Sequence, residues 1–421
     1  MVRVTADADE TMRHALAYPR LRAVAPEFTE HEGRPMLLLR DHLRLADQSI
    51  LVPPQLAILL SLFDGRRDHA TIRSAYQDQT GESITAIELD RLIGQFAALL
   101  LLDSPEATAA YQAATTAYRT APFRPPALAG RVYPADAQAL TRRIDGWLAD
   151  AGRRGGTPPA TGTVRGIVCP HIDYGRGAAV YADVWLPARA AVAAAEVIIV
   201  FGTDHHGSAG SVTPTRQRYA TPYGILENDR LALDALVAAL GEETAFAEEL
   251  HHRDEHSIEL AIVWLQHLLA GKATPIVPIL TGSFYPFTQG RQDAAAYAPF
   301  ASAVEALRSA TRGRRVLVAA AADLAHMGPA FGDPEPLDAP AKERITAADE
   351  ALLTALCTGS AEAFLGPLLA EHDARRICGL PPIYLTLRYL AGSSGIVTSY
   401  RQCPADAAFG SLVSAAGVLL E

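Results

Sequence analysis

AEVIIVFGTDHH, residues 195–206, joins a continuous apolar run to a polar cluster that begins at Thr203. An apolar run of this length, rich in Val and Ile, predicts a β-strand. Similar runs are VRGIVCP (164–170), ATPIVPILTG (273–282), RRVLVAAAAD (314–323) and GIVTSYR (395–401). Helical patterns separate them, and strands that alternate with helices are typical of a sheet covered by helices on its faces. The sequence therefore predicts an α/β domain over most of the chain.

Polar side chains follow three of these predicted strands. His171 and His205 each come directly after one run, and Asp323 and His326 close another. In open α/β sheets, ligands bind outside the carboxyl ends of the strands, so side chains from separate segments can converge there. A single histidine is more often a structural or surface residue, and Asp323 alone could cap a helix. The shared position after apolar strands favours a common site.

A second histidine pair lies in HHRDEHSIELAIVWLQHLL, residues 251–269. On a helix, His252 and His256 would share a face and could bind zinc, as in metalloproteases. No Glu follows His252 directly, so the metalloprotease motif is absent. We prefer the alternative in which Glu255 and His256 begin an amphipathic helix, with His256 facing the crevice and His252 facing solvent.

The chain contains four cysteines, which are too few and too scattered for a disulfide framework. Any cysteine chemistry should then involve a free thiol or a metal. Cys378 comes just before Gly379 and two prolines that fix a turn, and just after two arginines that could lower the pKa of a thiol. A buried inert thiol is the alternative for Cys378. The cysteines expected to be structural are Cys169, Cys357 and Cys403.

The composition suits a globular protein of two or three domains, with 421 residues of which 49% are hydrophobic and 20% charged. The formal net charge of −10 argues against nucleic-acid binding, which needs clustered Lys and Arg. The first 15 residues contain no apolar leader segment, and no later stretch has the length of a membrane span. We therefore expect a cytoplasmic protein with neither nucleic-acid nor membrane partners.

The first 120 residues are predicted to form a separate, smaller domain. MLLLRD and LRLADQSILV, within residues 36–52, predict a short hairpin. Three helical patterns follow, and Gly65 and Gly81 separate them. In pattern and length this domain resembles the winged-helix, PqqD-like peptide-recognition modules that accompany modifying enzymes.

A Pro-rich stretch, TAPFRPPALAG, separates that domain from the rest of the chain. Its prolines lack backbone donors and hold the chain extended, which predicts a linker over 121–128, the Pro-rich connector. The α/β domain then covers 129–421. Because few contacts should cross such a boundary, we expect a chain that begins near Ala127 to fold by itself.

From residue 129 onward the chain resembles the Memo family, which is protein B of the bacterial AmmeMemoRadiSam system. Eight blocks in order carry the resemblance: AGRVYPADAQAL with GWLAD, CPHIDYGRG, GTDHHG, YATPYGILENDR, DEHSIEL, PIVPILTG, ADLAHMG and ICGLPPI. The resemblance implies a fold similar to the class III extradiol dioxygenases, with a central mixed sheet flanked by helices and a site for non-haem iron.

The blocks also carry over residue roles. The implied metal ligands are His171, His205 and Cys378. The residues implied to line the site and act in catalysis are His256, Asp323 and His326. Many family members have Ala-Gly after the first motif histidine, whereas this chain has Ile172 and Asp173. We expect these two residues to bring a bulky side chain and a carboxylate toward the crevice.

Two imidazoles and one anionic ligand leave neighbouring metal positions open, as in the facial triads that activate oxygen at Fe(II). A thiolate also admits copper or zinc. His256 or His326 could act as general base, with Asp323 orienting an imidazole. We therefore expect a metal-dependent, dioxygenase-like oxidoreductase. Its expected metal is non-haem iron, and copper and zinc are the alternatives.

Two further hypotheses stay open. One is a zinc hydrolase, which would use a metal-bound water. The other is a peptide- or metal-binding module without catalysis. The substrate is expected to be a small molecule or a peptide, and the resemblance implies a radical-SAM enzyme and an AMMECR-type protein as partners.

Overall fold

The computed structural model describes residues 14–22, 25–46, 49–155 and 163–421. The chain divides into two compact units, residues 1–120 and 121–421, which are described separately. The segment on which the expected absence of a leader rests lies mostly outside the described residues. Among the helices of the described parts, none is long and apolar enough to cross a membrane.

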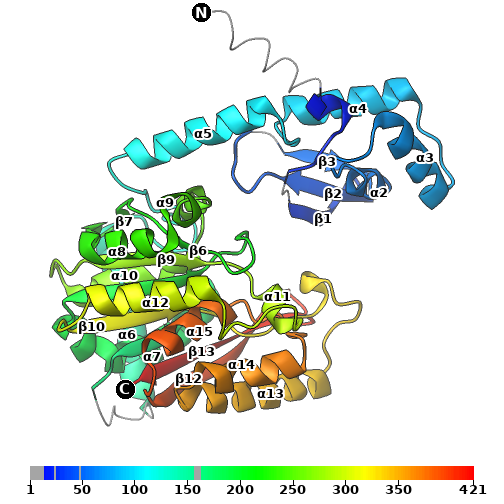
Figure 1. The fold of residues 1–421 in the computed structure, drawn as a ribbon. Coiled ribbons are helices and arrows are strands. Elements are labelled where there is room, and N and C mark those ends of the chain that lie inside the picture. The colour runs from blue at the N-terminus through cyan, green and yellow to red at the C-terminus, as the bar shows by residue number, and fades with distance from the viewer. Residues whose placement is uncertain (1–13, 23–24, 47–48, 156–162) are drawn as a thin grey trace, which may run out of the picture. The chain divides into compact units, whose positions relative to one another are not determined.

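The first unit contains a three-stranded antiparallel sheet in the order β1-β2-β3. Its strands and helices are β1 (Ala25–His31), β2 (Arg34–Arg40), β3 (Ile50–Val52), α2 (Leu56–Ser61), α3 (His69–Thr80), α4 (Ala86–Ala98) and α5 (Pro105–Thr120), drawn in blue to cyan in Figure 1. The predicted hairpin is present as β2 and β3, and Gly65 and Gly81 separate α2, α3 and α4 as expected. Strand β1 has no counterpart among the predicted elements, and the winged-helix resemblance stays a prediction.

The second unit is built on a mixed eight-stranded sheet, which confirms the predicted fold class. Its central strands follow the order β11-β13-β4-β10-β5-β9-β6, and β12 pairs with β13 at one side. The strands are β4 (Gly166–Cys169), β5 (Val197–Thr203), β6 (Val212–Pro214), β9 (Ile276–Thr281), β10 (Val316–Ala321), β11 (His326–Met327), β12 (Gly395–Pro404) and β13 (Leu412–Leu420). Strands β4, β10, β5 and β9 are parallel, so their carboxyl ends meet at one edge.

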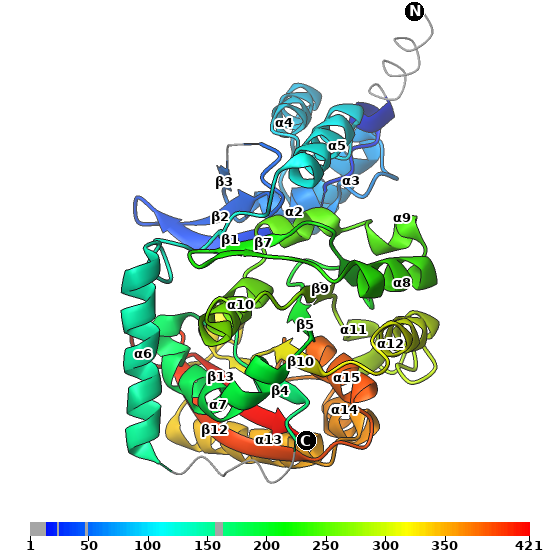
Figure 2. The same ribbon diagram turned by 90° about the vertical axis from the view of Figure 1, so that its left-hand side faces the viewer.

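Helices cover both faces of this sheet (Figure 2). On one face lie α6 (Ala137–Arg154), α7 (Tyr174–Ala194) and α10 (Ser257–Leu269). On the other lie α8 (Arg230–Leu240), α12 (Ala298–Ala310), α13 (Ala339–Cys357), α14 (Ala361–Ala370) and α15 (Leu380–Tyr389). The short elements between them are β7 (Tyr219–Thr221), β8 (Gly224–Leu226), α9 (Glu242–Ala245) and α11 (Tyr285–Thr288).

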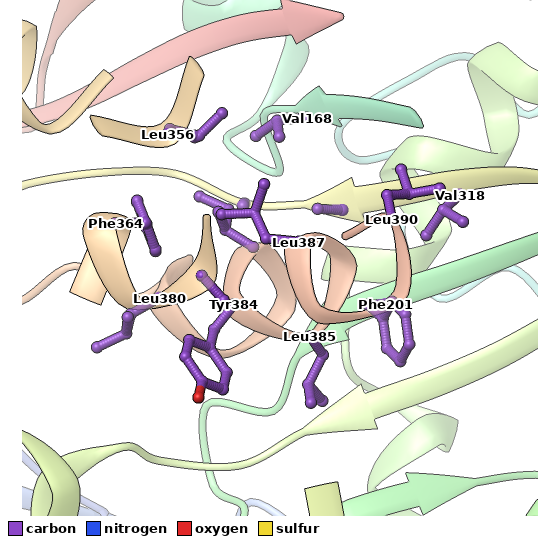
Figure 3. Packing of buried hydrophobic residues seen from close by; sticks show 14 of the residues in the cluster. Val168, Phe201, Val318, Leu356, Phe364, Leu380, Tyr384, Leu385, Leu387 and Leu390 are labelled. Carbon is purple, nitrogen blue, oxygen red and sulfur yellow. The ribbon is translucent and has the colours of Figure 1, made fainter. Parts of the chain in front are cut away.

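Successive side chains along each strand point to opposite faces of the sheet and so pack into two separate cores. In β5, Ile198 and Val200 pack with α7 and α10, whereas Ile199 and Phe201 pack with the opposite layer. Figure 3 shows this second core, in which side chains of α15 such as Leu387 lie against the sheet. Because both faces are covered, β4, β5, β9 and β10 are buried along almost their whole length and have continuous apolar sequences.

The Pro-rich connector packs into the second unit, which corrects its prediction as a linker. Arg124 is fully buried and forms an ion pair with the equally buried Glu259. The Arg124 guanidinium also donates to the carbonyl oxygens of His252, at 2.7 Å, and Glu255, at 2.9 Å. A buried charge has to be paired and hydrogen-bonded, so these contacts hold the connector against the α/β unit.

Candidate metal centre

Three segments of the second unit meet where β4, β10 and β5 end. His171 follows β4, His205 follows β5, and Cys378 precedes α15. The close approach of these segments depends on glycines. A Cβ at Gly379 would lie 2.4 Å from the carbonyl oxygen of Asp323, and one at Gly202 would lie 2.5 Å from Ile258 Cγ1. A larger residue at either glycine would push the site apart.

The side chains of His171, His205 and Cys378 converge as the sequence predicts. One potential ligand atom from each lies within 4.8 Å of the other two. Cys378 Sγ is 3.2 Å from His171 Nε2, and the two imidazole centroids are 5.1 Å apart. Metals bind imidazole and thiolate at about 2.0 to 2.3 Å, so small side-chain adjustments would let one ion contact all three.

Both histidines have one ring nitrogen occupied by an acceptor. His171 Nδ1 lies 3.0 Å from the carbonyl oxygen of Ala321, and His205 Nδ1 lies 3.0 Å from Glu255 Oε2. With a proton held at each Nδ1, the Nε2 lone pairs are available to a metal. This arrangement fits a metal site, in which outer acceptors fix the tautomer and orientation of ligating imidazoles.

Charge within the site is concentrated at the sulfur. Burial would raise the pKa of Cys378, but the adjacent His171 and His326 outweigh burial and hold this pKa well below its usual value. Burial would lower the pKa of His171, yet the Cys378 thiolate and Asp323 raise it to about 9. The sulfur is therefore already deprotonated, as metal ligation requires, whereas a metal ion would have to displace the proton that the raised pKa keeps on the His171 ring.

Asp323 and His326 lie beside the same sulfur. Asp323 is buried, accepts a hydrogen bond from the His171 amide at 3.1 Å, and has Oδ2 3.6 Å from His171 Nε2. It therefore does not act as the helix cap that was the alternative, and a two-residue strand follows it. His326 Nδ1 lies 3.0 Å from the carbonyl oxygen of Leu324. Burial would lower the pKa of His326, but the Cys378 thiolate raises it.

Glu255 links the candidate ligand His205 to His256, a role that the sequence does not reveal. Its Oε2 contacts His205 Nδ1, and its Oε1 lies 3.0 Å from His256 Nδ1. The His256 ring stacks on His205 with centroids 4.8 Å apart and an interplanar angle of 13°. The His256 side chain is 39% exposed, so it remains open to a substrate. The one available clue is the acid directly before His256 in DEHSIEL.

His252 lies elsewhere, which corrects both sequence interpretations. It sits on a short 3-10 turn over Glu249–Arg253, whereas His256 caps α10, so the two rings share no helix face. His252 is fully buried instead of facing solvent. Its Nδ1 lies 2.7 Å from the Tyr219 hydroxyl and its Nε2 lies 2.8 Å from the carbonyl oxygen of Thr213. It is a structural histidine.

A pocket of about 370 Å³ adjoins the centre. His205 and Cys378 form part of its wall, together with apolar side chains that include Phe284 and Leu380. The charged residues that line it include Asp373 and Arg376. Its volume suits a small ligand, and its position would place that ligand beside the sulfur.

The family described as Memo-like protein matches residues 124–419, which include all six predicted site residues. The chain belongs to the Memo-like family. Similar curated proteins include a MEMO1 family protein of Methanopyrus kandleri, 30% identical over 66% of this chain and 91% of its own length. Another from Methanothermobacter thermautotrophicus is 30% identical over 66% of this chain and 96% of its own length. The Caenorhabditis elegans protein memo-1 homolog is 28% identical over 62% and 69%.

The residues that depart from the usual Memo-like pattern have structural roles in this chain. Ile172 is buried in a small cluster with Cys403 and Val413. Asp173 caps α7, because its Oδ1 accepts a hydrogen bond from the Arg176 amide, and its carboxylate pairs with the Arg176 guanidinium. We expected both side chains to enter the crevice, and this expectation is wrong. Ile172 packs in the core and Asp173 caps a helix.

Among the residues of this unit that the structure describes, two further groups of potential ligands are present. His205, Glu255 and His256 form one group. Asp204, Glu248 and His251 form the other, within which Asp204 Oδ2 lies 2.8 Å from His251 Nδ1. Both groups already contain carboxylate–histidine contacts, and neither contains a thiolate. The group with Cys378 is therefore the better candidate for a redox-active metal.

Proposed function

We propose that this Memo-like protein is a metal-dependent oxidoreductase whose metal is held by His171, His205 and Cys378. The observation that carries the proposal is the convergence of Cys378 Sγ with two imidazoles whose Nδ1 atoms already contact acceptors. Two neutral imidazoles and one thiolate leave further metal positions open to substrate or oxygen.

Non-haem iron is the first candidate metal, and copper and zinc are the alternatives. When bound, iron or copper would supply one-electron redox chemistry toward oxygen, in a dioxygenase-like reaction. The thiolate donates more electron density than a carboxylate and can itself be oxidised, so it has to be shielded. The Cys378 side chain is part-buried, in keeping with this need.

The surrounding side chains would handle protons and orientation. His256 is the proposed general base toward an acidic substrate hydroxyl, because its ring is partly exposed beside His205. Glu255 would orient both rings through its two oxygens. Asp323 would hold the segment of His171, and His326 would donate a hydrogen bond toward the sulfur.

The proposed substrate is a small molecule or a segment of peptide that enters the 370 Å³ pocket. A radical-SAM enzyme and an AMMECR-type protein are the proposed partners, on the family resemblance alone. Because a fold does not determine a reaction, we infer the substrate class from the residues of the site and not from the fold.

Metal content of anaerobically purified full-length protein tests the proposal. We expect the wild type to contain about one equivalent of iron and to consume oxygen. The control Cys357→Ser, whose thiol lies on α13, should do the same. His171→Ala and Cys378→Ser should each lose metal at least tenfold. Retention of metal by both variants would contradict the assignment. Stoichiometric zinc without any reaction with oxygen would favour a zinc hydrolase instead.

A further inference from the structure

Asp349, in the middle of α13, is a fully buried carboxylate at the junction of several segments. It pairs with Arg375 through Oδ1. Its Oδ2 accepts hydrogen bonds from the Tyr400 hydroxyl at 2.9 Å and from the Ser414 hydroxyl at 2.6 Å. Three donors, from the turn before α15, from β12 and from β13, therefore converge on one carboxylate that does not contact the candidate metal ligands.

The first connection runs to the segment that carries Cys378. Arg375 lies three residues before that cysteine, and its carbonyl oxygen accepts a hydrogen bond from the His326 amide at 2.8 Å. His372, Asp373 and Arg376 surround Arg375 with left-handed φ angles of 52°, 51° and 54°. Such angles are costly for non-glycine residues and persist only where contacts hold them. Arg375 pairs both with Glu371, at 2.9 Å, and with the fully buried Asp349, and the Asp349 pair is the contact that joins this segment to α13.

The second connection runs to the segment that carries Asp323 and His326. Ser414 Oγ accepts a hydrogen bond from the Ala325 amide at 2.8 Å while it donates to Asp349. The Ser414 backbone also bonds Leu324 and Ala325. One carboxylate thus holds two segments that approach the sulfur from different parts of the chain.

We propose that Asp349 is a positioning residue that sets the placement of Cys378 and His326 relative to His171. In so far as these residues hold a metal, the inference rests on the proposed function. The physical reason is that Asp349 ties the buried Arg375 guanidinium to α13, whereas its other carboxylate partner, Glu371, lies only four residues before it in the same stretch of chain. Without the Asp349 charge, the segment with left-handed residues loses its anchor and Cys378 shifts with it.

Two readouts on the full-length protein test this role. The first is the affinity for Co(II) and the thiolate-to-Co(II) charge-transfer band, which reports the contact of sulfur with metal. The second is amide hydrogen exchange over 371–379 and 323–326 in metal-free protein. We expect Asp349→Asn to lower Co(II) affinity by about tenfold to hundredfold and to speed exchange in both segments. Asp349→Glu, which keeps the charge, should restore part of the Co(II) affinity and part of the protection from exchange.

Ser414→Ala provides a milder test, because it removes the bridge to Ala325 without leaving a buried charge unpaired. It should weaken the band and speed exchange at 323–326 more than at 371–379. Thr311→Val is the matched control, since it also deletes a buried hydroxyl, at the end of α12. It should change neither readout.

The outcomes separate the two claims. If wild-type protein shows no thiolate-to-Co(II) band, the proposed function fails, and the exchange data still decide the role of Asp349. If Asp349→Asn does not fold, Ser414→Ala decides it. An unchanged band and unchanged exchange in the folded Asp349 and Ser414 variants would overturn the inference.

Discussion

At the scale of single residues, the candidate centre depends on side chains that orient others. Glu255 contacts His205 and His256 with separate oxygens, so one carboxylate determines the direction of a ligand and of the proposed base. Burial would raise the pKa of Glu255, but these two imidazoles hold it well below its usual value. Glu255 therefore stays an acceptor at neutral pH.

Replacing Glu255 by Gln should weaken metal binding by about tenfold to hundredfold, because the amide cannot accept from both imidazoles as a carboxylate does. A titration with Co(II) measures the change. The matched control is Asp145→Asn, which alters another carboxylate–histidine pair, to His267 at 3.0 Å. Equal Co(II) affinities in Glu255→Gln and wild type would show that Glu255 does not orient the ligand.

His252 makes the stability of the α/β unit depend on pH. Burial, together with the nearby Arg124, lowers its pKa from 6.5 to about 3 although the Thr213 carbonyl opposes this. The unfolded chain then binds a proton that the folded chain rejects, so the contribution of neutral His252 is complete above pH 6.5 and is lost as pH falls toward 3. The loss amounts to about 1.4 kcal/mol per pH unit within that window.

His252→Gln removes this titration. Its destabilisation relative to wild type, measured by urea unfolding, should shrink by about 2 kcal/mol between pH 7.5 and pH 5. His31→Gln, which removes an exposed imidazole from the other unit, is the control for the loss of a ring. A pH-independent difference for His252→Gln would mean that the His252 ring has the same pKa in the folded and the unfolded chain.

At the scale of elements, the local sequence pattern identified some strands of the large sheet and missed others. The apolar runs identified β4, β5, β9 and β10, because a strand covered on both faces has a continuous apolar sequence, and they also identified β12, which is only half-buried. Strand β13, LVSAAGVLL, pairs with β4, β11 and β12 yet has no counterpart among the predicted strands. Its small residues Ser414, Ala415, Ala416 and Gly417 interrupt the apolar run, and they do so where neighbours pack closely, such as Val184 against Gly417.

The Pro-rich connector leads to a prediction about truncation. A chain that begins at Ala121 should fold. One that begins at Ala127, with its amino terminus acetylated so that no ammonium forms beside Glu259, lacks Arg124 and leaves Glu259 buried without its partner charge. The shorter chain should lose about 3 to 5 kcal/mol in the free energy of unfolding, measured in urea. Arg124→Met in the chain from Ala121 is the matched variant and should lose a similar amount. Equal stability of all three would show that the pair contributes nothing.

At the scale of the whole molecule, the parallel sheet gathers groups that are remote in the chain. His171 and Cys378 are 207 positions apart, yet their side chains meet at 3.2 Å because β4 and the segment before α15 reach the same sheet edge. The proposed metal site would thus link metal binding to stability, since the unfolded chain cannot hold the three candidate ligands together.

Added metal should therefore raise the free energy of unfolding of the α/β unit. At a free Co(II) concentration 100 times the dissociation constant, the gain is about 2.7 kcal/mol. Thermal unfolding with chelator and with excess Co(II) measures it. The shift should persist in Cys357→Ser and largely disappear in Cys378→Ser. An equal shift in Cys378→Ser would place the binding elsewhere.

The sequence by itself determined the α/β class, five strands of the large sheet, and the alignment of His171, His205, Cys378, Asp323 and His326 with the Memo-like pattern. These features are local, because strand runs and the residues that follow them are written in consecutive positions. Only the tertiary structure decided that Glu255 bridges two imidazoles, that His252 is buried, and that the connector packs against Glu259. It also placed Asp349 between two site segments. Such contacts depend on which distant segments lie side by side in the folded chain. The spacing of residues along the sequence does not specify this.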